Sequence, residues 1–512
     1  MRTETSEVPR TALRQMRGDD WARVAIQPGK YCNADALTGF QRRDGQGGNP
    51  LHPALGEDHL ELDLAERLDA LKGACSGAIA ERCHVAMPYW KGPQLPGPDD
   101  YSFVDAPERL VSTSITIAMV PNGPQVGAGL TFSFDGPHLP TLRERMRGAR
   151  FQGLLGNLGY FYTEALIKDY RWSHNRRYPS FPLDAMPSYI GFHLMEGEDP
   201  GELCGSFDGA HPGAVAVDSR RCLHILPKLG IGSYEVVFAA DLDTSLRVEM
   251  VDRVIPGAEV ILYTPAFRGL EEICRLIDAT ERSAGEDDGW QMCQPMVPLA
   301  EEEGRIQVFV ANSGNGQAPI EKVAEVWAGA SPLPSFGAVL SFSKQYFESQ
   351  FGGVEQFRER QMGQRVQVVP AAASARLGQM REVLGGLVPA VVDGCHVYAA
   401  AGNLVDAMEV LGRYGATSPI TQCGRETRNF HPLIREPAGL LAETDQHIGW
   451  ILFDGRHELS IGASFLDVVA ILRKLESDGV FGGRIRQAMF VDGGSAMKAY
   501  HVRRQGGSLR LD

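Results

Sequence analysis

His447-Ile-Gly-Trp-Ile-Leu-Phe453, followed by Asp454-Gly455-Arg456, is the stretch that decides the fold. Its mostly apolar first part predicts a buried strand, and the Asp-Gly pair predicts a turn at the end of that strand. A short second strand is expected over residues 459–461, where Gly462 would end it. The stretch therefore predicts the start of a sheet with a sharp turn at one end.

A helix with clear end signals follows these strands. Ser464 and Asp467 stand three residues apart, which is the spacing of a capping box. Apolar residues then recur on one helical face, and Gly479 lies just past the expected end of the helix. The apolar face consists of Phe465, Val468, Val469, Leu472 and Leu475.

The chain is then expected to return through a buried strand, Gln487-Ala-Met-Phe-Val491, whose end leads into Asp492-Gly493-Gly494-Ser495. Two glycines after an acidic residue let backbone N–H groups approach an oxygen-rich ligand closely. A tight turn in which Asp492 caps backbone N–H groups explains the same residues. The tetrapeptide alone does not choose between a ligand site and a turn.

The order of several short segments is more specific than any one of them. The segments are Asn157-Leu-Gly159-Tyr-Phe161, Leu262-Tyr263-Thr264-Pro265, Gly337-Ala-Val-Leu340-Ser341, Gly385-Gly386 with Asp393-Gly394, His431-Pro432 with Arg435 and Gly439, Asp454-Gly455-Arg456, and Asp492-Gly493-Gly494-Ser495. In this order they resemble the phosphodiester glycosidase family, whose secretory-pathway member removes N-acetylglucosamine from a sugar phosphodiester. The resemblance covers roughly residues 150–505.

The chain departs from the family pattern at sensitive positions. The last motif has two glycines where the family has three, and Ala496-Met497 replaces a Ser-Thr pair. Two extra residues separate His431-Pro432 from Arg435. These departures keep the family's fold as the expectation and leave the substrate open.

The resemblance implies an α+β fold in which antiparallel sheets pack with helices. Short apolar runs between residues 215 and 263, separated by Gly, Asp and Pro, also predict antiparallel sheet and not βαβ alternation. We expect residues 1–110 to form an N-terminal extension. Residues 111–512 are expected to form the phosphodiester-glycosidase-like domain, with insertions.

The implied reaction is hydrolysis of the glycosidic bond of a sugar 1-phosphodiester. A phosphate leaves the anomeric carbon readily without being protonated, so the enzyme mainly needs a clamp for the departing anion. Arg435 and Arg456 are the predicted clamp, because a planar guanidinium holds two phosphate oxygens at once. The resemblance also assigns substrate binding to Asn157, Thr264, Gly493, Gly494 and Ser495.

Asp492 is the leading candidate for a carboxylate that activates water, attacks the anomeric carbon or stabilises the oxocarbenium-like transition state. His431 could carry a proton near neutral pH, although a His before Pro also serves structure. Asp454 either takes part in the chemistry or only shapes its turn. No cofactor is required by the sequence, but Asp454, Asp492 and a phosphate oxygen would suit a divalent cation, Ca²⁺ or Mg²⁺.

The composition limits the partners. The formal charge of −14 argues against nonspecific binding to nucleic acid or to anionic membranes, so an anionic substrate needs a locally positive site. The first residues lack the apolar core of a signal peptide, and no run of about 18 apolar residues is present, which predicts a cytoplasmic protein. The nine cysteines form no Cys-x-x-Cys pair and indicate neither a zinc site nor a disulfide framework. The oligomeric state is not predicted.

Two other functions fit the same residues. A noncatalytic carbohydrate- or phosphate-binding protein is favoured by the missing third glycine and the altered His-Pro-Arg segment. A phosphoester hydrolase on the same fold would break the P–O bond in place of the glycosidic C–O bond.

Patterns elsewhere predict further elements. Leucines at helical spacing predict a helix over residues 60–74, and alternation predicts a strand over residues 111–120. Residues 344–362 are expected to form polar helices outside the core. A helix is expected to end at Gly385-Gly386, before a strand that runs into Asp393-Gly394.

Overall fold

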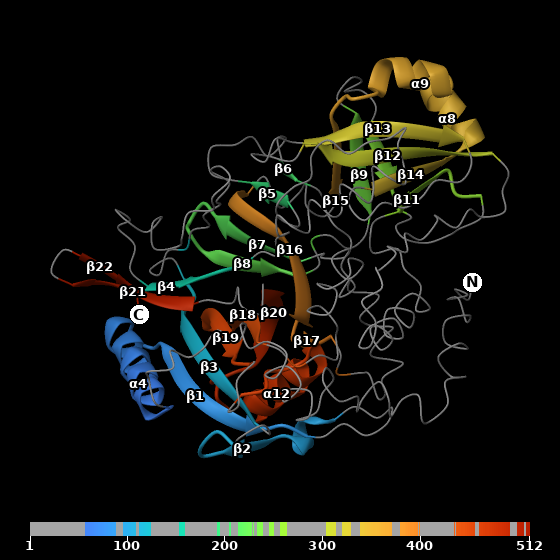
Figure 1. Ribbon diagram of the computed structural model, residues 1–512. Helices are drawn as coiled ribbons and strands as arrows, with labels where there is room; N and C mark the ends of the chain where they lie inside the picture. Colours follow the sequence, from blue (N-terminus) through green and yellow to red (C-terminus); the bar gives the residue numbers. More distant parts are fainter. Residues whose placement is uncertain are drawn as a thin grey trace, which may run out of the picture.

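In the computed structural model, antiparallel sheets carry most of the described chain (Figure 1). Every strand pair among the described residues is antiparallel, which confirms the predicted α+β class. The structure describes residues 57–88, 96–108, 112–123, 128, 153–158, 192–194, 204–205, 213–227, 229, 233–238, 245–249, 257–263, 304–313, 320–328, 338–370, 379–397, 399, 435, 437–455, 460–491, 499–505 and 508–511.

The main sheet has twelve strands. In their order across the sheet, nine of them are β2 (Ser102–Val104), β1 (Ile79–Ala86), β3 (Ser112–Pro121), β19 (His447–Phe453), β18 (Ala438–Thr444), β20 (Ile485–Val491), β16 (Met380–Val392), β5 (Phe192–Leu194) and β6 (Cys204–Gly205). The others are β7 (Gly213–Asp218) and β17 (Cys395–His396), which pair with β16, and β8 (Leu223–Leu226), which pairs with β7.

The deciding stretch forms the centre of this sheet. β19 has the predicted bounds, and β20 begins two residues before the predicted Gln487. Of the second strand expected over residues 459–461, the described part shows a single β-bridge residue, Ser460. Ser460 and Ile461 bond to β3, through Ser114 and Ser112.

Part of the predicted N-terminal extension belongs to this sheet. β1 pairs with β3 along its whole length, from Ile79 opposite Met119 to Ala86 opposite Ser112. The helix predicted over residues 60–74 is confirmed as α4 (Glu57–Ala74), which lies alongside β1 (Figure 1). The predicted domain boundary after residue 110 therefore falls inside one sheet.

One face of the central strands is covered by α12 (Phe465–Ser477). The Ser464 hydroxyl accepts a bond from the Asp467 backbone N–H, and the Asp467 carboxylate accepts one from the Ser464 N–H, which confirms the predicted capping box. Phe465 packs on Phe490 of β20, with ring centroids 4.2 Å apart. Gly479 follows the helix with φ +75°, a value that favours glycine.

β16 joins the main sheet to the strands around β7. Its last part pairs with β20 and its first part with β5 and β7. The register shifts between Gly385 and Leu387, and Gly386 has φ +84°. The prediction that a helix ends at this glycine pair is therefore wrong, because the two glycines form a bulge inside one long strand.

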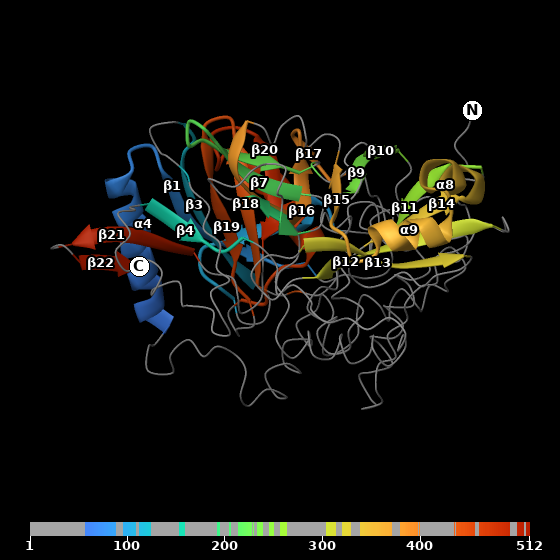
Figure 2. The ribbon, with the colours of Figure 1, turned by 90° about the horizontal axis from the view of Figure 1, so that it is seen from above.

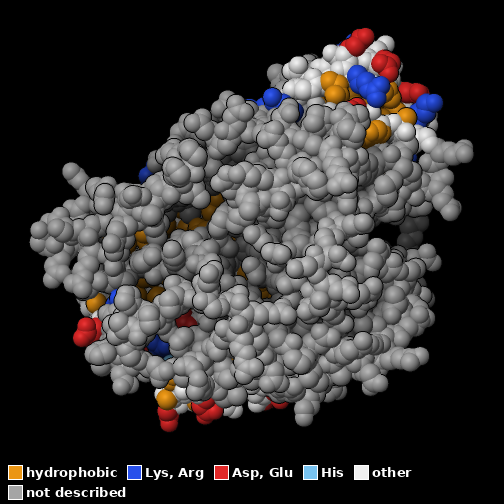
Figure 3. Space-filling model, in the orientation of Figure 1, with side chains coloured by type: hydrophobic (Ala, Val, Ile, Leu, Met, Phe, Trp, Pro, Cys, Tyr) orange, Lys and Arg blue, Asp and Glu red, His pale blue; other side chains and the backbone are white. Residues whose placement is uncertain are grey.

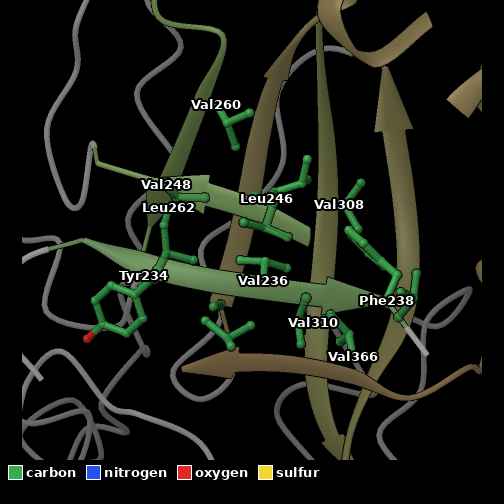
Figure 4. Packing of buried hydrophobic residues seen from close by; sticks show 14 of the residues in the cluster. Tyr234, Val236, Phe238, Leu246, Val248, Val260, Leu262, Val308, Val310 and Val366 are labelled. Atoms are coloured by element: carbon green, nitrogen blue, oxygen red, sulfur yellow. The ribbon is translucent and has the colours of Figure 1, made fainter. Parts of the chain in front are cut away.

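A second lobe contains a four-stranded and a three-stranded sheet, which Figure 2 shows beside the main sheet. Buried side chains of both sheets, such as Val236 and Val308, meet in one core (Figure 4). The four-stranded sheet consists of β11 (Val260–Tyr263), β14 (Ala338–Ser343), β12 (Arg305–Ser313) and β13 (Ile320–Ala328). The three-stranded sheet consists of β10 (Ser245–Val248), β9 (Tyr234–Phe238) and β15 (Val366–Pro370).

Two helices of the second lobe correct the expectation for residues 344–362. α8 (Lys344–Phe351) and α9 (Val354–Gln361) carry acidic and basic side chains on their outer face (Figure 3). Phe347, Phe351 and Phe357 are nevertheless buried in the core of the lobe. The helices are therefore amphipathic parts of the core, because one phenylalanine face outweighs their polar composition.

A small sheet of β22 (Ser508–Leu511), β21 (Ala499–Gln505) and β4 (Gly153–Gly156) lies against the main sheet. A Cβ atom on Gly156 would stand 2.4 Å from the Trp450 ring, so glycine lets β4 approach β19 closely. Ile451 and Phe490 both lie opposite Leu440 of β18, so Ile451 points to the same face as Phe490, the face that α12 covers. Side chains alternate along a strand, so Trp450, the neighbour of Ile451, points to the other face. A short 3-10 helix, η1 (Pro98–Asp100), precedes β2.

None of the described helices has the length and apolar character needed to span a membrane.

Candidate functional site at one end of the main sheet

Three of the predicted motifs are joined directly to neighbouring strands. β19 ends one residue before Asp454, β20 ends one residue before Asp492, and β18 begins three residues after Arg435. β18 lies between the other two strands and is antiparallel to both. The ends of β19 and β20 and the start of β18 therefore lie together, at what we call the motif end of the sheet.

The strand register gives the spacing at the motif end. Ala438 of β18 lies opposite Phe453 of β19, and Gly439 lies opposite Val491 of β20. Neighbouring strands are about 4.8 Å apart, so the ends of β19 and β20 are roughly 10 Å apart. Several predicted site residues themselves lie outside the described residues, namely His431, Arg456, Thr264, Asp492, Gly493, Gly494 and Ser495.

Asn157 is brought within reach of the last motif. It follows Gly156 of β4, which lies opposite Ala499 of β21, four residues after Ser495. Four residues span at most about 14 Å, so the two segments are close. Thr264 differs, because it follows Tyr263, the last residue of β11 in the second lobe.

Asp454 is the predicted catalytic residue that the structure describes in detail. Its backbone N–H donates to the Ser114 carbonyl at 2.9 Å, and its carbonyl accepts from the Ser460 hydroxyl at 2.7 Å. Ser460 Oγ also accepts from the Ser114 N–H at 2.9 Å. These bonds fix the backbone of the turn, while 45% of the Asp454 side chain stays exposed. The carboxylate is thus available to a solute.

Arg82 of β1 lies beside this carboxylate. Its Nη2 atom is 3.7 Å from Asp454 Oδ2, and 22% of its side chain is exposed. Burial raises the pKa of Asp454 above its ordinary value, against the opposing effect of the Arg82 charge. The ion pair and the exposure of the carboxylate make this pair a candidate for contact with a solute.

His84 adds a second polar group on the same strand. Its Nδ1 atom lies 2.9 Å from Ser114 Oγ, and the residue is buried. Arg82 and His84 are two residues apart on β1, so both side chains point to one face of the sheet. Sequence reasoning missed Arg82 because the resemblance begins later in the chain. A strand of alternating pattern with Arg and His at alternate positions was the available signal.

Arg435 has a protein partner in place of the predicted phosphate. Its Nε and Nη2 atoms donate to Asp467 Oδ2 and Oδ1, each at 2.9 Å, and Nη2 also donates to the Pro88 carbonyl at 2.8 Å. The Arg435 side chain is 5% exposed and that of Asp467 is fully buried. This internal ion pair occupies the guanidinium that the sequence analysis assigned to the phosphate clamp.

Asp467 is stabilised as an anion at the start of α12. Burial raises the pKa of Asp467, but the Arg435 charge and hydrogen bonds from Arg435, Tyr101 and Ser464 lower it below its ordinary value. The Tyr101 hydroxyl donates to Oδ1 at 2.7 Å. The carboxylate therefore joins α12, the segment before β18 and the segment before β2 into one structural unit.

The described residues contain no group of three or more His, Cys, Asp and Glu side chains arranged to hold a metal ion. Asp492 lies outside them, so a site that it would share with Asp454 is not tested.

Comparisons with known proteins leave the function open. No family model matches the chain, and no curated protein matches it at a significant level. A crystal structure of a hypothetical protein from Synechocystis matches with 16% identity and a TM-score of 0.31, over 78% of this chain and 56% of that one. A structure of a candidate exported protein from Burkholderia pseudomallei matches with 12% identity and a TM-score of 0.30, over 78% of this chain and 70% of that one. Similarity this low carries no argument about function.

Proposed function

We propose that the protein is a hydrolase that cleaves the glycosidic bond of a sugar 1-phosphodiester, releasing a sugar such as N-acetylglucosamine from a phosphorylated metabolite in the cytoplasm. The observation that carries the proposal is the strand register at the motif end. It brings the attachment points of Asp454 and Asp492 to within roughly 10 Å of each other, and the Asp454 carboxylate is exposed there. Paired carboxylates flanking the scissile bond are the common machinery of glycosidases.

The two carboxylates would have different roles in this proposal. Asp492 would act on the anomeric carbon, directly or through water, with N–H groups of Gly493 and Gly494 beside it. Asp454 would line the phosphate side of the site, where its carboxylate lies 3.7 Å from the Arg82 guanidinium and helps to position it. In this proposal Arg456 would hold the phosphate, and His431 would carry a proton.

The test is release of N-acetylglucosamine from a methyl phosphodiester of N-acetylglucosamine 1-phosphate. We expect Asp492→Asn to lower kcat by about 100-fold or more, and Asp454→Asn to lower it less. Asp478→Asn is the matched control, because this half-exposed residue caps the far end of α12. Wild-type turnover by Asp492→Asn would show that the catalytic assignment is wrong.

A noncatalytic sugar-phosphate-binding protein is the second candidate. The internal ion pair of Arg435 with Asp467 favours it, because one of the two predicted anion clamps is then committed to structure. Tight binding of N-acetylglucosamine 1-phosphate, with no turnover of any activated phosphodiester, would select this function over hydrolysis.

A further inference from the structure

Among the described residues, the guanidinium group of Arg82 makes only a long contact, with Asp454. Its distance of 3.7 Å to Asp454 Oδ2 exceeds the 2.7–3.2 Å of a hydrogen bond. Its Nε atom is buried and has no hydrogen-bond partner among the described residues, so no bond at Nε holds the group in place. The exposed part of the side chain is available to a ligand.

Arginines with structural roles in this chain are bound differently. Arg435 makes two bonds of 2.9 Å to the Asp467 carboxylate. Arg305 donates to Ser341 Oγ, to the Ser341 carbonyl and to the Ala258 carbonyl at 2.7–2.8 Å. Short, directed bonds of this kind are absent from the described surroundings of the Arg82 Nε atom, which distinguishes Arg82 from these two residues.

The position of Arg82 suits an anion at the motif end. Arg82 lies opposite Thr116 of β3, which lies opposite Leu452 of β19. Asp454 stands two residues after Leu452, so strand alternation carries its side chain toward the same face as Arg82. With 22% of the Arg82 side chain and 45% of the Asp454 side chain exposed, a small solute can reach both.

We propose that Arg82 binds the phosphate group of the sugar phosphate, in the role that the sequence suggested for Arg435. The inference rests on the proposed substrate class. The planar guanidinium would hold two phosphate oxygens through its two terminal nitrogens. Asp454 is its counter-ion when no ligand is bound, and the phosphate takes over that contact on binding. In a chain with a formal charge of −14, this provides the local positive group that an anionic substrate needs.

The experiment is calorimetric titration with N-acetylglucosamine 1-phosphate and, separately, with N-acetylglucosamine. We expect the wild type to bind the phosphorylated sugar more tightly. Arg82→Gln should weaken that binding at least about ten-fold, because charged hydrogen bonds are lost, and should leave the uncharged sugar unaffected. Arg220→Gln is the matched control, because the Arg220 side chain is 74% exposed beside Asp218, and its affinities should equal those of the wild type.

The outcomes separate this inference from the proposed function. Equal affinity of Arg82→Gln and the wild type for the sugar phosphate overturns the inference, even if the protein cleaves phosphodiesters. No measurable binding of the sugar phosphate to the wild type also overturns it. Binding that depends on Arg82 without any turnover supports the inference and refutes the hydrolase. If thermal unfolding shows that Arg82→Gln does not fold, Arg82→Lys decides, since wild-type affinity in that variant would contradict a two-oxygen contact.

Discussion

Replacing Asp467 with alanine should destabilise the protein strongly. The substitution leaves the 5% exposed guanidinium of Arg435 without its carboxylate, and the Tyr101 hydroxyl loses its acceptor. Removing one partner of a buried ion pair costs about 3–5 kcal/mol. The lost capping box acts in the same direction, since α12 loses the bond from the Ser464 N–H.

The expected shift in melting temperature follows from the size of the chain. An unfolding entropy of about 2.1 cal/mol/K per residue over 512 residues is roughly 1.1 kcal/mol/K, if the chain unfolds as one unit. A loss of about 4 kcal/mol then lowers Tm by about 4 °C. Calorimetry of Asp467→Ala beside Asp478→Ala measures this, and the control should stay within about 0.5 kcal/mol of the wild type.

A double substitution tests the reasoning further. Arg435→Met with Asp467→Leu removes both charges, and well-packed apolar replacements of buried ion pairs are often neutral. The double variant should therefore be more stable than Asp467→Ala. A cost below about 1 kcal/mol for Asp467→Ala would refute the reasoning, because it would mean that Arg435 reaches solvent and could serve a ligand after all.

Further predictions concern acid stability and backbone approach. Since the pKa of Asp467 is lowered in the folded state, its contribution to stability is present above the ordinary value of 3.8 and is lost as pH falls through the folded pKa. The difference in stability between wild type and Asp467→Asn should therefore shrink below about pH 4, as followed by chemical denaturation. Gly156→Ala should cost about 1–3 kcal/mol, because its Cβ would stand 2.4 Å from the Trp450 ring, whereas Gly73→Ala, with no atom within 4 Å, should be neutral or stabilising in the same assay.

The elements that could be predicted from the sequence are those whose determinants are local. The capping box of Ser464 and Asp467 needs only a spacing of three residues, and the apolar run of β19 needs only its own residues. The bulge at Gly386 was not predictable in this way, because paired glycines suit a helix end as well as a bent strand. Strand pairing across the bulge decides between them.

The candidate site depended on contacts between distant parts of the chain. Tyr101 and Asp467 are 366 residues apart in sequence, and only the sheet register brings them together. The motif pattern pointed to Arg435 as an anion clamp, but its anion is supplied by the protein itself. Arg82 reaches Asp454 because β3 lies between β1 and β19, and no local pattern reveals that order of strands.

The most direct measurement is hydrolysis of the methyl phosphodiester of N-acetylglucosamine 1-phosphate in water labelled with a heavy oxygen isotope, followed by mass spectrometry of both products. The proposed mechanism predicts the label on the anomeric carbon of the released sugar and none on methyl phosphate, because water attacks carbon. Label on the phosphate would show P–O cleavage and contradict the glycosidase mechanism. Absence of any product, from a folded protein that binds N-acetylglucosamine 1-phosphate, would contradict hydrolysis altogether.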